Sequence, residues 1–201
     1  MEHYTELEQK AVSKNNQLEA QVGLMRCNYF LERFDQARNY AELVLVNAGT
    51  PQDIKFTAQL WRARIDMRNG AYDAAIADFK EVMKKGGEYA AEAKYSIANC
   101  IYKKGEYKKA ETEIFQFFEK YSGFQEYQFK GYLLLVDIYI AMPDYVQAES
   151  TTDLILQNVE EPWVVEETLK RQKQIEELKN PNGGSKSNQD IEIDLVPQSN
   201  D

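Results

Sequence analysis

The chain has 201 residues, of which 43% are hydrophobic, so it is long enough to bury a core in one elongated domain or in one to two compact ones. Its formal net charge of -9 argues against a nucleic-acid-binding protein, because phosphate binding depends on a surplus of Lys and Arg. No apolar run approaches the roughly 18 to 20 residues that span a bilayer, and the opening MEHYTELEQK lacks the basic and apolar parts of a signal peptide.

A short sequence motif recurs along the chain. GAYDAA at residues 70–75 and GEYKKA at residues 105–110 share Gly, Tyr and Ala at the same offsets, and RFDQA and PDYVQA are looser copies. Each copy ends in an alanine, here called the anchor alanine; the anchors are Ala37, Ala75, Ala110 and Ala148. They are 38, 35 and 38 residues apart, and repeats of this length are typical of stacked helical hairpins.

Other positions repeat relative to the anchors. An aromatic residue stands three positions before each of them: Phe34, Tyr72, Tyr107 and Tyr145. Apolar residues recur ten positions before each anchor and seven and eight positions after it. The pattern predicts four hairpins, each with a first helix of about 15 residues and a second helix that begins near the aromatic residue. The break between the two helices is expected at Arg33, Gly70, Gly105 or Pro143, since Gly adopts the left-handed conformation that ends a helix and Pro interrupts one.

In chain order, the pattern predicts seven segments. Residues 1–13 are expected to form the second helix of a partial preceding repeat, and units follow at 14–52, 53–88, 89–124 and 125–161. Residues 162–179 begin with Pro and read as an amphipathic capping helix; a coiled coil is the weaker alternative, because fewer than three heptads are present. Residues 180–201 have the composition of a disordered tail. Its stretch IEIDLV alternates apolar and acidic residues and is either a solvated acidic segment, the favoured interpretation, or a strand that adds to a sheet edge.

The residues that commonly carry catalysis are scarce. Cys27 and Cys100 occupy equivalent positions two units apart, roughly 16 to 20 Å at ordinary helix spacings of about 8 to 10 Å, so we expect two buried free thiols that share neither a disulfide nor a zinc ion. His3 is the single histidine, and no glycine-rich loop follows a strand. We therefore expect a protein that is not an enzyme and that uses no cofactor and no metal.

The repeats resemble tetratricopeptide repeats over residues 14 to about 161. Ala63 and Ala98, twelve positions before their anchors, match the small residue of that family, and Phe79 and Ile114 match its large residue four positions after the anchor. The two middle units fit better than the outer two. The resemblance implies an all-α fold, a right-handed superhelical solenoid of about four helical hairpins with a C-terminal capping helix.

The resemblance also suggests a setting for the chain. Irregular repeats with a charged capping helix resemble the C-terminal part of a large bacterial repeat protein, which implies the cell envelope or periplasm. Repeat arrays need polar caps at both ends, and this chain starts without one. We expect that it is the C-terminal part of a longer array, or that its N-terminal face is covered by a partner or by self-association.

In this family the first helices line a concave groove that binds a peptide or a partner helix. The family pattern places five cations there, Arg26, Arg64, Arg68, Lys103 and Lys130, against three anions, Glu19, Glu92 and Asp137. The groove is therefore basic relative to the rest of the chain, which favours an acidic or carboxylate-bearing peptide of another protein as partner. The residues expected to bind it are Arg26, Tyr29, Arg64, Arg68, Tyr95, Asn99, Tyr102 and Lys103.

The chemistry of these side chains fits such a peptide. Arg offers paired donors to a carboxylate, and Tyr supplies contact area at low entropic cost. The alternative is a solvated surface with extended arginines. Asn99 and Lys103 match only a fragment of the family's carboxylate clamp, because Tyr95 stands where a clamp lysine would be.

A second function remains open at this point. The same hairpins could form a small-ligand or glycan-binding lipoprotein, as in some nutrient-binding lipoproteins of bacterial outer membranes. The short connections between helices disfavour this alternative. An aromatic-lined pocket larger than about 300 Å³ would favour it.

Overall fold

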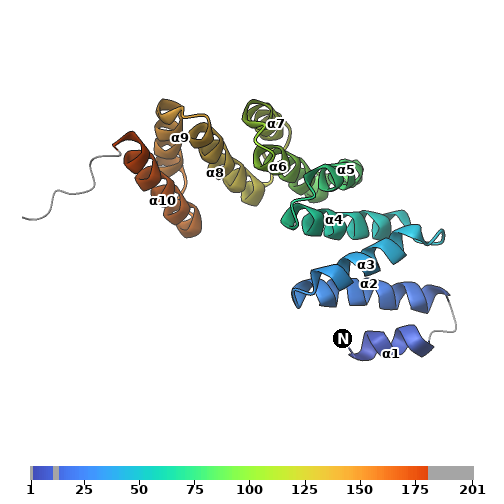
Figure 1. Cartoon of the computed structure of the whole chain (residues 1–201). Coiled ribbons are helices and arrows are strands. Elements are labelled where there is room, and N and C mark those ends of the chain that lie inside the picture. Colours follow the sequence, from blue (N-terminus) through green and yellow to red (C-terminus); the bar gives the residue numbers. More distant parts are fainter. Residues whose placement is uncertain (1, 11–13, 181–201) are drawn as a thin grey trace, which may run out of the picture.

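The computed structural model describes residues 2–10 and 14–180, most of which are helical and none of which forms a strand (Figure 1). The elements are α1 (Glu2–Lys10), α2 (Lys14–Phe30), α3 (Phe34–Val46), α4 (Gln52–Arg68), α5 (Tyr72–Val82), the 3-10 turn η1 (Met83–Lys85), α6 (Gly87–Lys103), α7 (Tyr107–Lys120), α8 (Gln125–Ala141), α9 (Tyr145–Asn158) and α10 (Pro162–Lys179). The predictions for residues 11–13 and 181–201, including the disordered tail, lie outside the described residues.

The helices pack as hairpins that follow one another in chain order. α2 pairs with α3, α4 with α5, α6 with α7 and α8 with α9, and each hairpin also contacts the next. Together they form an arc, with α1 at one end and α10 at the other (Figure 1). This arrangement confirms the predicted all-α solenoid. α10 packs against both α8 and α9, which is the place that the first helix of a further hairpin would take.

The second helix of each hairpin begins where the repeat pattern predicted. α3, α5, α7 and α9 begin at the four aromatic residues, Phe34, Tyr72, Tyr107 and Tyr145. The limits assigned to whole repeat units, which run through the connections between hairpins, stay a prediction.

One backbone turn closes all four hairpins. Five positions before the first three anchors the φ angle is positive, at Glu32 (57°), Gly70 (78°) and Gly105 (80°), and Pro143 holds this position in the fourth turn. In each turn the residue after this position donates its backbone N–H to the carbonyl five positions earlier, as from Arg33 to Asn28 at 2.8 Å and from Ala71 to Asp66 at 2.8 Å. Arg33 lies in the break between α2 and α3, as predicted, and within that break Glu32 takes the left-handed place that Gly70 and Gly105 occupy in their turns.

The anchor alanines are fully buried, because the two helices of each hairpin cross there. A large cluster of buried side chains extends from Leu60 in α4 to Ile175 in α10. A smaller, separate cluster joins α2, α3 and the start of α4 and consists of Met25, Ala41, Val44 and Ala58. The core along the array therefore consists of two clusters of buried side chains, which meet at α4 without joining.

The two cysteines differ in their surroundings. Both are free thiols, as predicted. Cys100 is fully buried, and burial raises the pKa of its thiol to about 12. Cys27 is only partly buried, so the prediction that it lies in the core is wrong. It lines a hollow between α1, α2 and the start of α4.

None of the helices in the described stretches combines the length and the apolar character needed to cross a bilayer.

Candidate functional site

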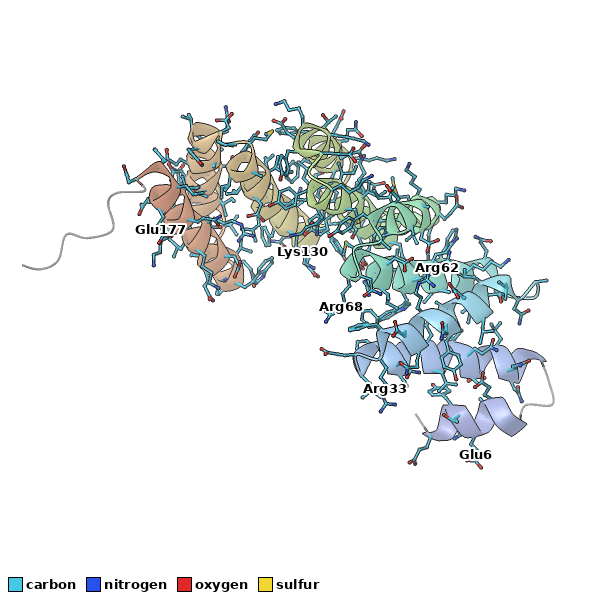
Figure 2. All side chains as sticks on the ribbon, in the orientation of Figure 1. Glu6, Arg33, Arg62, Arg68, Lys130 and Glu177 are labelled. Carbon is cyan, nitrogen blue, oxygen red and sulfur yellow. The ribbon has the colours of Figure 1, made fainter. Side chains whose placement is uncertain are left out.

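The first helices of the hairpins, together with α10, line the inner side of the arc. α2 contacts α4, α6 contacts α8, and α8 contacts α10. Figure 2 shows Arg68 of α4 and Lys130 of α8 on this side of the arc. We call the surface formed by α2, α4, α6, α8 and α10 on this side the inner surface.

The eight residues predicted to bind a partner fall in two groups on these helices. Arg26, Tyr29, Arg64 and Arg68 lie on α2 and α4, and Tyr95, Asn99, Tyr102 and Lys103 lie on α6. Arg26, Arg68 and Lys103 are exposed, and the other five are partly buried. All four residues of the second group line one hollow, whereas only Arg26 and Arg64 of the first group line another, so the structure does not gather all eight at one site.

The first group adjoins the central hollow, which has a volume of about 450 Å³. Its lining consists of Arg26, Phe30, Thr57, Leu60, Trp61, Arg64, Glu88, Tyr89, Glu92 and Tyr127. On one wall, Arg64 donates from Nε to Glu92 Oε1 at 2.6 Å, and the Tyr127 hydroxyl donates to Glu92 Oε2 at 2.9 Å. The carboxylate of Glu92 is nearly buried, so Arg64 is already paired within the chain.

Aromatic side chains of α2 and α4 also border the central hollow. The ring centroids of Tyr29 and Trp61 are 4.3 Å apart, and those of Phe30 and Trp61 are 5.5 Å apart, both edge to face. The guanidinium of Arg64 lies 5.0 Å from the Trp61 ring, and that of Arg68 lies 4.3 Å from the ring of Phe34. Rings and guanidinium groups thus stabilise each other where α2, the start of α3 and α4 meet.

Phe30 is the most open of these aromatic residues. Its side chain is 73% exposed. Phe30 and Arg26 line both the central hollow and an N-terminal hollow of about 720 Å³ between α1, α2 and the start of α4. The two residues therefore form a ridge between two hollows, where an apolar ring and a cation are presented together.

The second group surrounds the C-terminal hollow, which has a volume of about 210 Å³. Its lining consists of Tyr95, Asn99, Tyr102, Lys103, Lys130, Leu133, Leu134, Asp137 and Arg171. Arg171 of α10 donates to both oxygens of Asp137, from Nε at 2.7 Å and from Nη2 at 2.9 Å. Burial and the nearby carboxylate of Asp137 raise the pKa of the Tyr95 phenol to about 12, so this hydroxyl stays neutral.

These ion pairs change the predicted charge balance of the inner surface. Glu92 neutralises Arg64, and Lys130 pairs with Glu126 at 2.5 Å. Within the described residues, Arg26, Arg68 and Lys103 form no ion pair. Those three are the cations that remain for a partner.

Sequence reasoning missed three residues of these hollows: Trp61, Tyr127 and Arg171. Trp61 and Tyr127 do not follow the repeat signature. Arg171 carries a detectable signal, because it follows Asp137 by 34 residues, close to the repeat length, and so continues the pattern into α10.

Clusters of metal ligands were also sought. Across residues 2–10 and 14–180, no group of three or more His, Cys, Asp or Glu side chains lies close enough to hold a metal ion.

Known proteins resemble this chain in sequence and in fold. Residues 53–181 match the family model YfiO, described as an outer membrane lipoprotein. A comparison with curated proteins found no match. Among solved structures, a tetratricopeptide repeat protein from Parabacteroides merdae ATCC 43184 superposes with a TM-score of 0.59 at 14% sequence identity, over 86% of this chain and 68% of that one. At that identity the likeness shows the fold alone, and the fold is of the tetratricopeptide repeat type. The family model spans more than half of the sequence, from the start of α4 to just beyond α10, and the chain therefore belongs to the YfiO family of outer membrane lipoproteins.

Proposed function

We propose that this chain is a non-catalytic scaffold in the bacterial cell envelope that binds another protein through its inner surface. The observation that carries the proposal is the set of exposed cations, Arg26, Arg68 and Lys103, that have no ion-pair partner among residues 2–10 and 14–180. They lie on the inner side of an array whose fold is generally used for protein interaction. The partner segment that fits them is acidic or bears a carboxylate, because Arg pairs with carboxylates in a bidentate geometry.

Apolar contact area is available next to these charges. Phe30 is 73% exposed beside Arg26, and Leu31, directly after the same helix, is 53% exposed. Exposed apolar groups rimmed by polar residues are typical of interaction sites. A partner with an acidic residue beside a large apolar one would satisfy both the cation and the ring.

Arg64 is assigned a different role from the one that the sequence suggested. Its guanidinium holds Glu92, which in turn accepts from Tyr127. Replacing Arg64 would leave a nearly buried carboxylate without its cation, which destabilises a protein whether or not a partner binds. A test of binding must therefore alter Arg26 and Arg68 instead.

The test compares two double variants that carry the same charge change. Arg26→Glu with Arg68→Glu reverses the exposed cations of the inner surface. Lys84→Glu with Lys108→Glu reverses two exposed cations on η1 and α7, away from the first helices. Each chain is immobilised and exposed to extract of the source organism, after circular dichroism has shown equal helicity.

We expect the inner-surface variant to capture at least about tenfold less of a partner than the unaltered chain, which corresponds to about 1.4 kcal/mol, while the control variant captures as much. Equal capture by all three chains would place recognition elsewhere on the molecule and refute the proposal.

A second candidate function is supported by the central hollow. Its volume of about 450 Å³ exceeds the lower bound of about 300 Å³ for ligand sites, and four of its lining residues are aromatic: Phe30, Trp61, Tyr89 and Tyr127. This candidate is a small-ligand or glycan-binding lipoprotein. The test uses a Trp163→Phe chain, in which Trp61 is the single tryptophan, and titrates it with oligosaccharides. A saturable change in tryptophan fluorescence would support ligand binding, and an unchanged signal would favour the scaffold.

A further inference from the structure

The C-terminal hollow has the character of a site for a peptide side chain. Leu133 and Leu134 are 6% and 4% exposed and form its apolar part with Tyr95 and Tyr102. Its volume of about 210 Å³ is below the range of about 300 to 1,000 Å³ for pockets of small molecules. The hollow therefore suits one or two side chains of a polypeptide better than a free ligand.

The charges around the hollow define what that polypeptide must carry. Three cations, Lys103, Lys130 and Arg171, line it against one anion, Asp137. Arg171 pairs with Asp137 and Glu167, and Lys130 pairs with the exposed Glu126, so Lys103 is the cation of this lining without an ion-pair partner among residues 2–10 and 14–180. The ammonium of Lys103 is exposed and lies 5.3 Å from the ring of Tyr102, so it is held at the rim above the apolar part. An occupant with apolar side chains and nearby carboxylates matches this layout.

A segment of this composition follows α10 in the same chain. Residues 191–196 read Ile-Glu-Ile-Asp-Leu-Val. Residues 181–201 contain one cation, Lys186, and four anions, Asp190, Glu192, Asp194 and Asp201, for a net charge of -3. When such an alternating sequence is extended, its apolar side chains project to one side and its carboxylates to the other.

We propose that the segment at residues 191–196 binds in the C-terminal hollow of its own chain. Its Ile and Leu side chains contact Leu133 and the tyrosines. Glu192 and Asp194 pair with Lys103 and compete with the exposed Glu126 for Lys130 at the rim. The proposal rests on the proposed function, because both require the inner surface to accept an acidic segment. It adds a specific occupant, which an external partner must displace.

The chain is long enough for this contact. Arg171 lines the hollow, and α10 continues for eight residues to Lys179, about 12 Å at 1.5 Å per residue. The ten residues 181–190 span up to about 33 Å when extended. A tether of this length gives an effective concentration in the millimolar range, so even weak contacts suffice for occupancy.

Amide chemical shifts of the full chain test the proposal. Glu192→Lys with Asp194→Lys reverses the charges of the segment, and Asp190→Lys with Asp201→Lys makes the same change in net charge outside it. We expect the first variant to shift the amide signals of Tyr102, Lys103 and Leu133 relative to the unaltered chain, and the second to leave them in place. Equal shifts in both variants, or none in either, would overturn the proposal.

Dilution distinguishes the chain's own segment from that of a second copy. A tenfold dilution leaves an intramolecular contact unchanged, so the difference between the unaltered chain and the first variant should persist. A difference that disappears on dilution would make another copy the occupant and overturn the inference.

A synthetic peptide of residues 189–197 separates this inference from the proposed function. In the Glu192→Lys, Asp194→Lys chain the internal segment no longer competes for the hollow. The peptide should therefore bind this chain about tenfold more tightly than the unaltered chain, if the effective concentration of the internal segment is about ten times its dissociation constant. Equal binding to both chains would overturn the internal contact and leave the inner surface as an acceptor of acidic peptides. No binding to either chain would count against both.

Discussion

The first hairpin and the three that follow share one repeat but differ in how they are held. From α4 to α10 a single cluster of buried side chains runs through every hairpin, whereas α2 and α3 share with the start of α4 only the cluster of Met25, Ala41, Val44 and Ala58. The family model begins at residue 53, close to the same division. In a repeat array each hairpin is stabilised by its neighbours, so the part with the smaller core is expected to open first.

Alanine substitution at one equivalent position gives the largest expected difference in unfolding free energy between the first hairpin and the part from α4 to α10. Phe117 and Val44 both stand seven residues after an anchor, and both are fully buried. Phe117→Ala removes a ring that packs against Phe118 and Tyr121 and should lower the free energy of unfolding by about 3 to 5 kcal/mol. Val44→Ala should lower it by about 2 kcal/mol. Urea denaturation measures both, and an equal or larger cost at Val44 would contradict the comparison.

Alkaline pH should lower the stability of the part from α4 to α10 through Tyr95 on α6. The pKa of its phenol is raised to about 12 in the folded chain, so the unfolded chain, with an ordinary value near 10, loses the proton first. The stabilisation from the neutral phenol is therefore fully present below about pH 10 and is lost as the pH rises toward 12. Two pKa units correspond to about 2.7 kcal/mol.

The matched measurement compares the unaltered chain with Tyr95→Phe by urea denaturation at pH 9 and at pH 12. We expect the unaltered chain to lose about 2 kcal/mol more than the variant over this interval. An equal loss in both chains would show that other groups cause the alkaline weakening.

Contact between α1 and α2 depends on Gly23. A Cβ atom there would lie 2.4 Å from ring atoms of Tyr4, so Gly23→Ala must displace the ring that α1 places on α2. We expect hydrogen exchange of the α1 amides to accelerate about tenfold, or about 1.4 kcal/mol, while exchange in α6 to α8 stays the same. Gly123→Ala is the control, because a Cβ there meets nothing within 4 Å. Unchanged exchange in α1 would show that Tyr4 does not hold this helix.

Substitution of Glu32 should give the smallest change in stability, and it should stabilise the chain where the other changes destabilise it. Its φ of 57° is a left-handed conformation that a side chain disfavours, whereas Gly70 and Gly105 occupy the equivalent turns without that cost. Glu32→Gly should stabilise the first hairpin by about 0.5 to 1 kcal/mol, measured by hydrogen exchange of the α2 and α3 amides. Destabilisation instead would indicate that contacts of the Glu32 side chain outweigh the backbone strain.

Much of the fold was predictable because the repeat constrains it. The anchors and the aromatic residues before them mark where two helices cross and where the second one starts, and a pattern repeated four times averages out local irregularities. The left-handed conformation of Glu32 was not predicted, because Glu does not favour it and only alignment with Gly70 and Gly105 reveals the position.

The candidate site was less predictable for an equally physical reason. The repeat indicates which face a residue occupies, but the partner of a charged side chain depends on neighbouring hairpins. Arg64 and Glu92 are 28 residues apart, and Asp137 and Arg171 are 34 apart, so neither pair follows from helical spacing. Whether Arg64 is available to a partner therefore required the structure, and the binding role of the eight predicted residues stays a prediction.

Glu92 also bears on the mechanics of the array. Its two carboxylate oxygens join Arg64 of α4 and Tyr127 of α8, so one side chain of α6 ties three consecutive hairpins together on the inner side of the arc. Pulling the ends of the arc apart would separate α4 from α8 and stretch both contacts, whereas squeezing the ends together would not. The array should therefore resist straightening at α6, with its resting curvature set near this carboxylate.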